Sequence, residues 1–196
     1  MEYRLTKDDL LNTLIAWNKF LKKKVHLIAC GGTALTLAGV KDSTKDIDFM
    51  VPDEKEYEYL ISLLQEVGYH AVTGWGWQKE GEQYIFDLFR GKSIHTTELL
   101  ESPLKKGNNT KILELSHLYV GVLNYYDLLI SKLFRGDTVD ITDSLALVKQ
   151  KKEEIDIKIF EERYLEAAKY DVSEEKCRKT LEHFMNLLKE ENIHGK

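Results

Sequence analysis

Two short apolar segments and the residues between them constrain the fold most strongly. Residues 25–30 predict a buried strand that Gly31-Gly32 ends, and residues 33–38 follow as a short helix. Residues 47–51 predict a second buried strand, which Pro52 closes. A strand, a glycine turn, a short helix and another strand are typical of a unit that packs helices on a sheet.

Asp46 and Asp48 stand one residue apart at the start of the second strand. Alternate residues of a strand point to the same face, so both carboxylates would lie on one side while Ile47 and Phe49 face the core. Two carboxylates this close repel each other unless a cation lies between them or one takes a proton. Mg²⁺ is the expected cation, with Mn²⁺ as the alternative, because it prefers oxygen ligands and combines carboxylates with substrate phosphates.

Gly31, Gly32 and Thr33 are predicted to bind a phosphate. Backbone N–H groups at the start of the following helix would face a common point without interference from a Cβ atom. Thr33 would cap that helix or donate its hydroxyl to a phosphate oxygen. A phosphate site beside metal-binding carboxylates indicates a nucleoside triphosphate and phosphoryl or nucleotidyl transfer. Taken singly, the glycine pair also fits a plain turn, and the aspartates fit a solvated edge strand.

Asp87 is the candidate third acid. It stands alone among apolar residues in a predicted strand at 83–89, and an unpaired buried charge is costly. A site that holds two metals needs such a carboxylate. The alternative is that Asp87 faces solvent on an antiparallel strand.

Gly31-Gly32, a spacer of thirteen residues and Asp46-Ile-Asp48-Phe together resemble the signature of the DNA polymerase β-like nucleotidyltransferase superfamily. Within it, this stretch is most similar to minimal nucleotidyltransferases that include abortive-infection type toxins of bacterial toxin–antitoxin systems. Residues 127–143 resemble the helix, glycine turn and acidic segment of the same branch, although Asp137 and Val139 stand where those relatives commonly carry basic residues.

The resemblance implies metal-dependent transfer of a nucleoside monophosphate from a nucleoside triphosphate to an acceptor hydroxyl, with release of pyrophosphate. It implies that Asp46, Asp48 and Asp87 hold the metal, that Lys132 contacts the triphosphate and that Asp143 orients the site. Without the resemblance, Lys132 would be a solvated lysine and Asp143 an exposed acid or a charge near a helix start.

The resemblance leaves the acceptor open among tRNA, a protein side chain and a small molecule such as an aminoglycoside. An antitoxin protein is an implied partner of the toxin interpretation. A nucleotide-binding or partner-binding module without catalysis is the alternative to an enzyme.

The hydrophobic pattern changes along the chain. The first part predicts a capped N-terminal helix, a helix at 53–67 and a hairpin that turns at 80–82, whereas helices are predicted from about residue 117 onward. We therefore expect an α/β (α+β) fold: a small mixed β-sheet nucleotidyltransferase core with flanking helices at 1–115, followed by a helical region at 116–196 that closes the active-site cleft. The helices are expected at 124–134, 138–149, 156–169 and 173–190.

Composition narrows the class of partner and the compartment. The formal charge of −5 indicates no strongly basic surface for free nucleic acid or an anionic membrane, with a local basic cleft as the alternative. No apolar run approaches the roughly 20 residues that span a bilayer, and no signal region begins the sequence, so a cytoplasmic protein is expected. Cys30 and Cys177 are expected to be buried reduced thiols. Trp75 and Trp77 alternate at strand spacing, which favours hairpin packing, with base stacking as the alternative.

Overall fold

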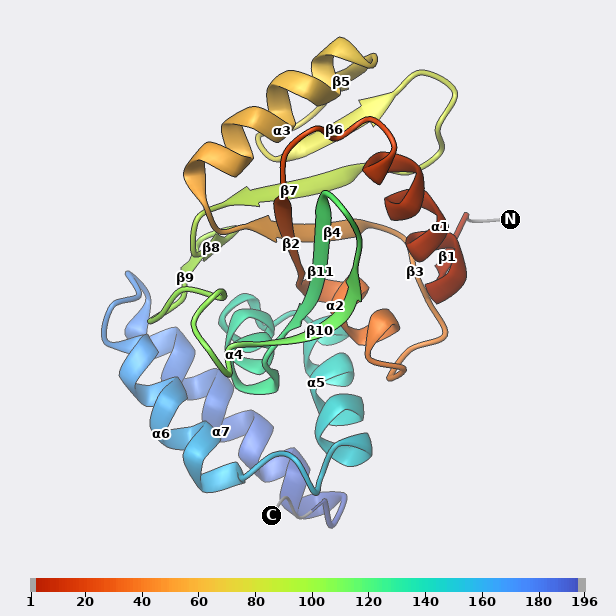
Figure 1. Cartoon of the computed structure of the whole chain (residues 1–196). Helices are drawn as coiled ribbons and strands as arrows, with labels where there is room; N and C mark the ends of the chain where they lie inside the picture. The colour runs from red at the N-terminus through yellow and green to blue at the C-terminus, as the bar shows by residue number, and fades with distance from the viewer. Residues whose placement is uncertain (1–2, 194–196) are drawn as a thin grey trace. The chain divides into compact units, whose positions relative to one another are not determined.

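The structure is a computed structural model that describes residues 3–193 (Figure 1). The chain divides into two compact units. The first contains the described residues through His95 together with Glu101–Leu123, and the second contains Thr96–Leu100 and the residues from Asn124 onward. Within the described residues, no helix has the length and apolar character needed to cross a membrane.

The first unit is built on a mixed β-sheet, as predicted. Within the described residues it has seven strands in the order β10-β11-β2-β4-β7-β6-β5. β11 and β2 are parallel, as are β4 and β7, and the remaining neighbours are antiparallel. The strands are β2 (Val25–Ala29), β4 (Ile47–Val51), β5 (Tyr69–Ala71), β6 (Gly76–Lys79), β7 (Phe86–Arg90), β10 (Asn109–Glu114) and β11 (Leu118–Leu123). The shorter strands are β1 (Leu5–Thr6), which pairs with β3 (Ser43–Thr44), and β8 (Ser93–Ile94) in this unit, and β9 (Thr97–Glu98) in the second.

Two helices of the first unit pack on one face of the sheet. α1 (Lys7–Asn18) begins with a capping box between Thr6 and Asp9, and α3 (Glu54–Glu66) begins with Asp53 as its N-cap. The ring of Trp17 on α1 lies 4.3 Å from that of Phe86 on β7, and Arg90 of β7 pairs with Glu54 and Glu58 of α3. Alternate strand residues face opposite sides. Phe86, Leu88 and Arg90 therefore face α1 and α3, while Asp87 and Phe89 face the other side of the sheet.

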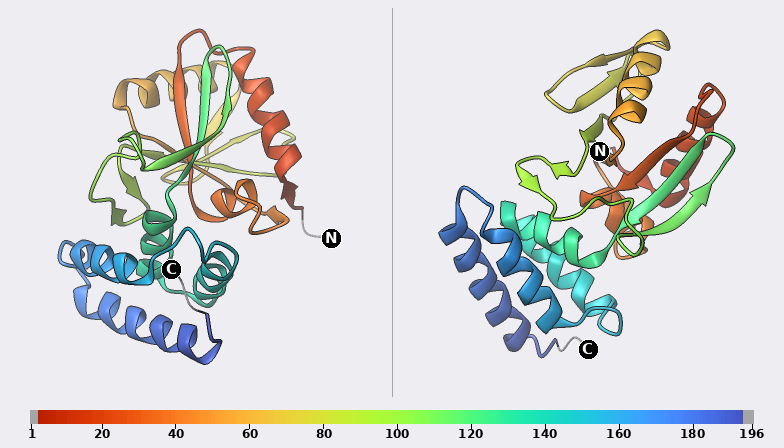
Figure 2. Two further views of the ribbon diagram at one scale, coloured as in Figure 1. Left: turned by 60° about the horizontal axis from the view of Figure 1, so that its bottom comes forward. Right: turned by 60° about the vertical axis from the view of Figure 1, so that its left-hand side comes forward.

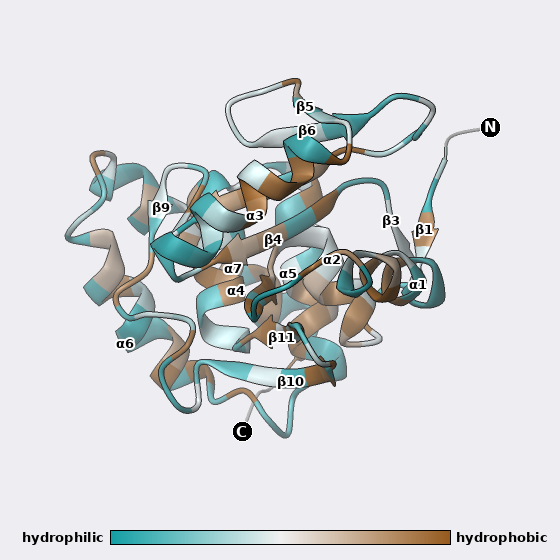
Figure 3. Ribbon diagram, turned by 45° about the horizontal axis from the view of Figure 1, so that its top comes forward, coloured by the Kyte–Doolittle hydropathy of each residue, from teal (hydrophilic) through white to brown (hydrophobic). Residues whose placement is uncertain are grey.

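Residues 118–123 correct the predicted start of the helical region. They form β11, which pairs in parallel with β2, although the helical region was expected from residue 116; the first helix begins at Tyr125, one residue after its predicted start. Figure 3 shows β11 and β4 coloured as hydrophobic. A strand covered on both faces is apolar throughout and lacks the alternation that marks a half-buried strand, so its pattern does not separate it from a buried helix. The hairpin strand β7 also begins three residues later than expected, at Phe86.

The second unit is helical, and its helices agree with the predicted segments to within about a residue at most ends. They are α4 (Tyr125–Arg135), α5 (Thr138–Gln150), α6 (Ile157–Ala168) and α7 (Glu174–Glu190). α6 and α7 lie side by side (Figure 2), and the rings of Phe160 and Phe184 meet at 6.0 Å between them. Cys177 on α7 and Cys30 after β2 are buried and form no disulfide, as expected.

Candidate active site

Asp48 and Asp87 are neighbours across two strands of the first unit. β4 and β7 pair in parallel with Asp48 opposite Asp87, so both side chains leave the same face of the sheet. Both are half-buried, and exposed Asp46 immediately precedes β4. Burial raises the pKa of the Asp87 carboxyl, and the negative charge of Asp46 raises that pKa further. The fold therefore gathers the three predicted acids on one side of adjacent strands.

Two threonine hydroxyls fix the backbone that carries Asp46 and Asp48. Thr33 Oγ1 donates to the Asp46 carbonyl at 3.0 Å and accepts from the Asp48 N–H at 2.9 Å. Thr44 Oγ1 donates to the same carbonyl at 3.0 Å. Both threonines are buried. The Thr33 hydroxyl thus orients the strand that carries the candidate carboxylates instead of lying free for a phosphate oxygen. Thr44 bonds to the same carbonyl, and the sequence interpretation missed it.

The two glycines make room for side chains of the same site. α2 (Gly31–Leu37) begins directly after β2, and Gly31 has φ +54°, which disfavours a side chain. A Cβ atom on Gly31 would overlap Asp48 Oδ2, and one on Gly32 would lie 2.6 Å from Thr44 Oγ1. The Gly32 N–H donates to Asp48 Oδ2 at 3.2 Å. The start of α2 therefore holds the Asp48 carboxylate, and its predicted contact with phosphate stays a prediction.

Gly76 also lies against a candidate carboxylate, that of Asp87. It lies opposite Asp87 in the β6–β7 ladder, and a Cβ atom there would stand 3.1 Å from Asp87 Oδ1 and 2.5 Å from Thr73 Oγ1. Sequence reasoning passed over this glycine. Its position between Trp75 and Trp77 is a usable signal, because glycine inside a strand often marks the close approach of another group.

Lys132 and Asp143 belong to the second unit, where they pair with each other. Lys132 Nζ donates to Asp143 Oδ2 at 2.8 Å and to Asp140 Oδ1 at 3.2 Å, and Arg135 also donates to Asp140. Lys132 is 2% exposed and Asp143 6%. A solvated lysine and an exposed acid, two of the three alternatives, are therefore wrong, and the acidic residue in the first turn of α5 is Asp140 and not Asp143. The predicted contacts of Lys132 and Asp143 with the nucleotide stay predictions.

The donor set of the first unit fits a hard divalent cation. Asp48 and Asp87 offer carboxylate oxygens on one face of neighbouring strands, and the charge of Asp46 is near enough to act on Asp87. Over the described part of the chain, no group of three acidic, histidine or cysteine side chains is arranged to hold a metal by itself. Mg²⁺ commonly takes only one or two carboxylates and completes its shell with water and substrate phosphates, so this arrangement suits it.

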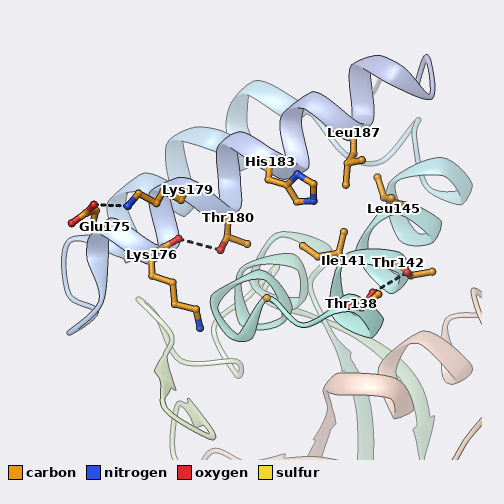
Figure 4. A pocket seen from close by; sticks show the side chains of 11 residues that line it. Thr138, Ile141, Thr142, Leu145, Glu175, Lys176, Lys179, Thr180, His183 and Leu187 are labelled. Carbon is orange, nitrogen blue, oxygen red and sulfur yellow. Dashed lines mark hydrogen bonds and ion pairs between the residues drawn. The ribbon is translucent and has the colours of Figure 1, made fainter.

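The second unit has a groove between α5 and α7 (Figure 4). Its volume is about 860 Å³, its walls include Ile141, Leu145 and Leu187, and Lys176, Lys179 and His183 also line it. The Lys179 ammonium is already paired with Glu175, and Lys176 Nζ donates to the Arg135 carbonyl. None of the predicted site residues lines this groove.

Comparisons with known proteins give a family match for the sequence and similar solved structures. The model of the family described as "nucleotidyltransferase of unknown function (DUF6036)" matches residues 9–192. No curated protein matches the chain. A candidate nucleotidyltransferase from Thermotoga maritima is similar in structure, with TM-score 0.48 and 17% identity over 73% of this chain and 94% of the other.

Two further solved structures are similar to the chain. An antigenic nucleotidyltransferase-like protein from Paracoccidioides brasiliensis has TM-score 0.45 and 14% identity over 90% of this chain and 95% of its own. The enzyme ANT(2'')-Ia in complex with adenylyl-2''-tobramycin has TM-score 0.42 and 18% identity over 90% and 93%.

Proposed function

The chain belongs to this nucleotidyltransferase family, and we propose that it transfers a nucleoside monophosphate from a nucleoside triphosphate to an acceptor hydroxyl, with a divalent metal bound and pyrophosphate released. The observation that carries the proposal is the register of β4 and β7, which sets Asp48 beside Asp87 on one face. A fold without this chemistry would gain nothing from two half-buried carboxylates on neighbouring strands, since their repulsion opposes folding.

Each candidate site residue of the first unit has a role in the proposal. Asp46 and Asp48 hold the metal, and the start of α2 at Gly31–Thr33 accommodates the triphosphate. The acceptor oxygen forms a bond to the α-phosphorus while the bond to pyrophosphate breaks, and the acceptor proton passes to a base. Asp87 is that base, because its carboxylate leaves the same face of the sheet as Asp48, beside the place proposed for the metal.

Mg²⁺, when bound, would neutralise charge on the leaving pyrophosphate and lower the pKa of the acceptor hydroxyl. The Thr33 and Thr44 hydroxyls keep the two metal-binding carboxylates in place, so the chain contributes mainly positioning and charge. Lys132 has no role in this scheme, because its ammonium pairs with two carboxylates. Its contact with the triphosphate stays a separate prediction.

We propose that the acceptor is tRNA and that the protein is a toxin of the toxin–antitoxin kind. The support is the similarity of residues 31–49 and 127–143 to the minimal nucleotidyltransferases that include such toxins. The alternatives are a small-molecule acceptor of the aminoglycoside type and a module that binds nucleotide without turnover. The same metal and phosphate geometry suits each acceptor, so the acceptor has to be identified by reaction.

Ligand-dependent stability tests the nucleotide site first. The midpoint of thermal unfolding is measured with each of the four nucleoside triphosphates, with and without Mg²⁺, for the wild type and for Asp46→Asn/Asp48→Asn. At about 100 times its dissociation constant, a ligand stabilises the native state by roughly 2.7 kcal/mol. A magnesium-dependent rise that the double variant loses is expected. An equal rise in the double variant would refute the metal site at these residues.

Transfer of label then identifies the acceptor. The protein is incubated with each α-³²P-labelled triphosphate and Mg²⁺, together with total tRNA or a panel of aminoglycosides, and labelled product is separated from released pyrophosphate. Label in tRNA, with slowed growth on expression that Asp48→Asn abolishes, is the expected result. Label in an aminoglycoside would replace the toxin proposal. Nucleotide binding without labelled product or pyrophosphate would favour the non-catalytic module.

A further inference from the structure

Two tryptophans that looked equivalent in the sequence have different surroundings in the first unit. Trp77 on β6 pairs with Phe86 in the ladder and is 8% exposed, which confirms hairpin packing for this residue. Trp75 precedes β6 and is 41% exposed. A large aromatic side chain that stays exposed beside a buried one is free to contact a ligand.

Ring contacts show on which face of the sheet Trp75 lies. Its indole stands 5.9 Å from the ring of Phe89 and 5.3 Å from that of His95, nearly perpendicular to the latter. Phe89 follows Asp87 by two residues on β7, so both side chains leave the same face, about 6.6 Å apart along the strand. Trp75 therefore adjoins the face that carries the candidate carboxylates.

The partners of Trp75 hold the indole in place. Phe89 is almost completely buried, and its ring meets that of His95 at 4.7 Å, so the indole rests on a packed aromatic pair. Gly76 follows immediately, and a Cβ atom there would stand 3.1 Å from Asp87 Oδ1. One short segment thus places an exposed indole next to the glycine that lies opposite Asp87 in the β6–β7 ladder.

We propose that Trp75 stacks on the base of the nucleoside triphosphate. The inference rests on the proposed function and names a part of the same site that recognises a planar heterocycle. An exposed indole serves this purpose because every base has a π face, and such stacking tolerates different bases. Loss of one base–aromatic stack weakens binding by about 5- to 150-fold.

Two ligands that share phosphates but differ in the base provide the test. Dissociation constants of the preferred nucleoside triphosphate and of inorganic tripolyphosphate are measured by calorimetry with Mg²⁺, on the full chain. Variants are Trp75→Leu, Trp75→Phe and, as a matched loss of an exposed aromatic in the second unit, Tyr170→Leu. Trp75→Leu should weaken nucleotide binding by about 5- to 150-fold. Trp75→Phe should weaken it less, and tripolyphosphate binding should be unchanged in both.

The outcomes separate this inference from the proposed function. Equal weakening of both ligands in Trp75→Leu would mean a structural effect and would overturn stacking. Unchanged nucleotide binding in Trp75→Leu would overturn it as well, while the proposed function would stand on the wild-type result. A wild type that binds neither ligand, although correctly folded, would refute both.

Discussion

The substitution Thr33→Val tests whether the Thr33 hydroxyl holds the two candidate metal ligands, Asp46 and Asp48, in place. Valine has nearly the shape of threonine, so the substitution removes the hydroxyl with little change in volume. It leaves the Asp48 N–H without its acceptor and the Asp46 carbonyl with Thr44 as its remaining hydroxyl donor. The perturbation is therefore confined to the backbone on either side of Ile47.

The loss of stability can be estimated from the hydrogen bonds that the variant loses and keeps. A buried N–H left without a partner costs about 1–3 kcal/mol, whereas the carbonyl keeps its bond from Thr44 and loses less. We expect Thr33→Val to lower the free energy of unfolding by about 2 kcal/mol. For a chain of this size, that corresponds to a midpoint about 4–8 °C lower. Any displacement of the carboxylates acts on turnover as well, where misplacement by about 1 Å can cost 10²-fold.

Thr36→Val is the matched control on the same helix. Thr36 is 1% exposed, and its Oγ1 has no hydrogen-bond partner among the described residues. Replacing a buried hydroxyl that has no partner removes a polar atom without breaking a bond, so this variant should be as stable as the wild type or more so. Urea unfolding of both variants measures the difference. Equal stability of Thr33→Val and Thr36→Val would refute the positioning role of the Thr33 hydroxyl.

Three further perturbations have defined outcomes. Gly31→Ala and Gly39→Ala both place a side chain at positive φ, which costs about 1–2 kcal/mol of stability each, but only the alanine at 31 meets the Asp48 carboxylate. Transfer of labelled nucleotide should therefore fall by about 10²-fold or more in Gly31→Ala alone. Similar activities of the two variants would contradict the contact. The pKa of Asp87 is raised, so its contribution favours folding at acid pH and is lost as pH rises through that pKa. Asp87→Asn should therefore raise the thermal midpoint of the ligand-free protein at pH 7 and abolish transfer, and a lower midpoint would show that the charge is compensated. Lys132→Met removes the ammonium that Asp140 and Asp143 share, although Asp140 keeps its ion pair with Arg135. It should cost about 3–5 kcal/mol in urea unfolding. A stable variant with weakened triphosphate binding would instead favour the nucleotide contact predicted for Lys132.

Local signals explain why much of the fold could be predicted. The capping box of Thr6 and Asp9 and the N-cap at Asp53 act within a few residues of the chain, and the structure has both helices where these signals indicate. Residues 47–51 form a strand with the expected limits because Pro52 ends it. β11 was missed because its apolar run reflects cover on both faces, which is a property of the assembled sheet and not of the segment.

The candidate site shows the same division between local and long-range information. The pattern of glycines and aspartates predicts that Asp46, Asp48 and the start of α2 belong together, and hydrogen bonds from Thr33 and Gly32 connect them. The pattern does not reveal that side chains from β4 and from the segment before it fill the space at both glycines. Nor does it show that Lys132 is neutralised by acids eight and eleven residues later, because that pairing depends on how α5 packs on α4.

β7 explains why fold and site are difficult to change separately. Its residues alternate between two tasks, with Phe86, Leu88 and Arg90 against α1 and α3, and Asp87 and Phe89 on the face of the proposed chemistry. A slip of one residue in the β4–β7 register would exchange the two sets, burying a carboxylate against α1 and exposing apolar rings. Packing of the apolar set therefore fixes the register that brings Asp87 beside Asp48. The close approach at Gly76 and the threonine hydroxyls then have only to adjust the carboxylates within a register that the core has already selected.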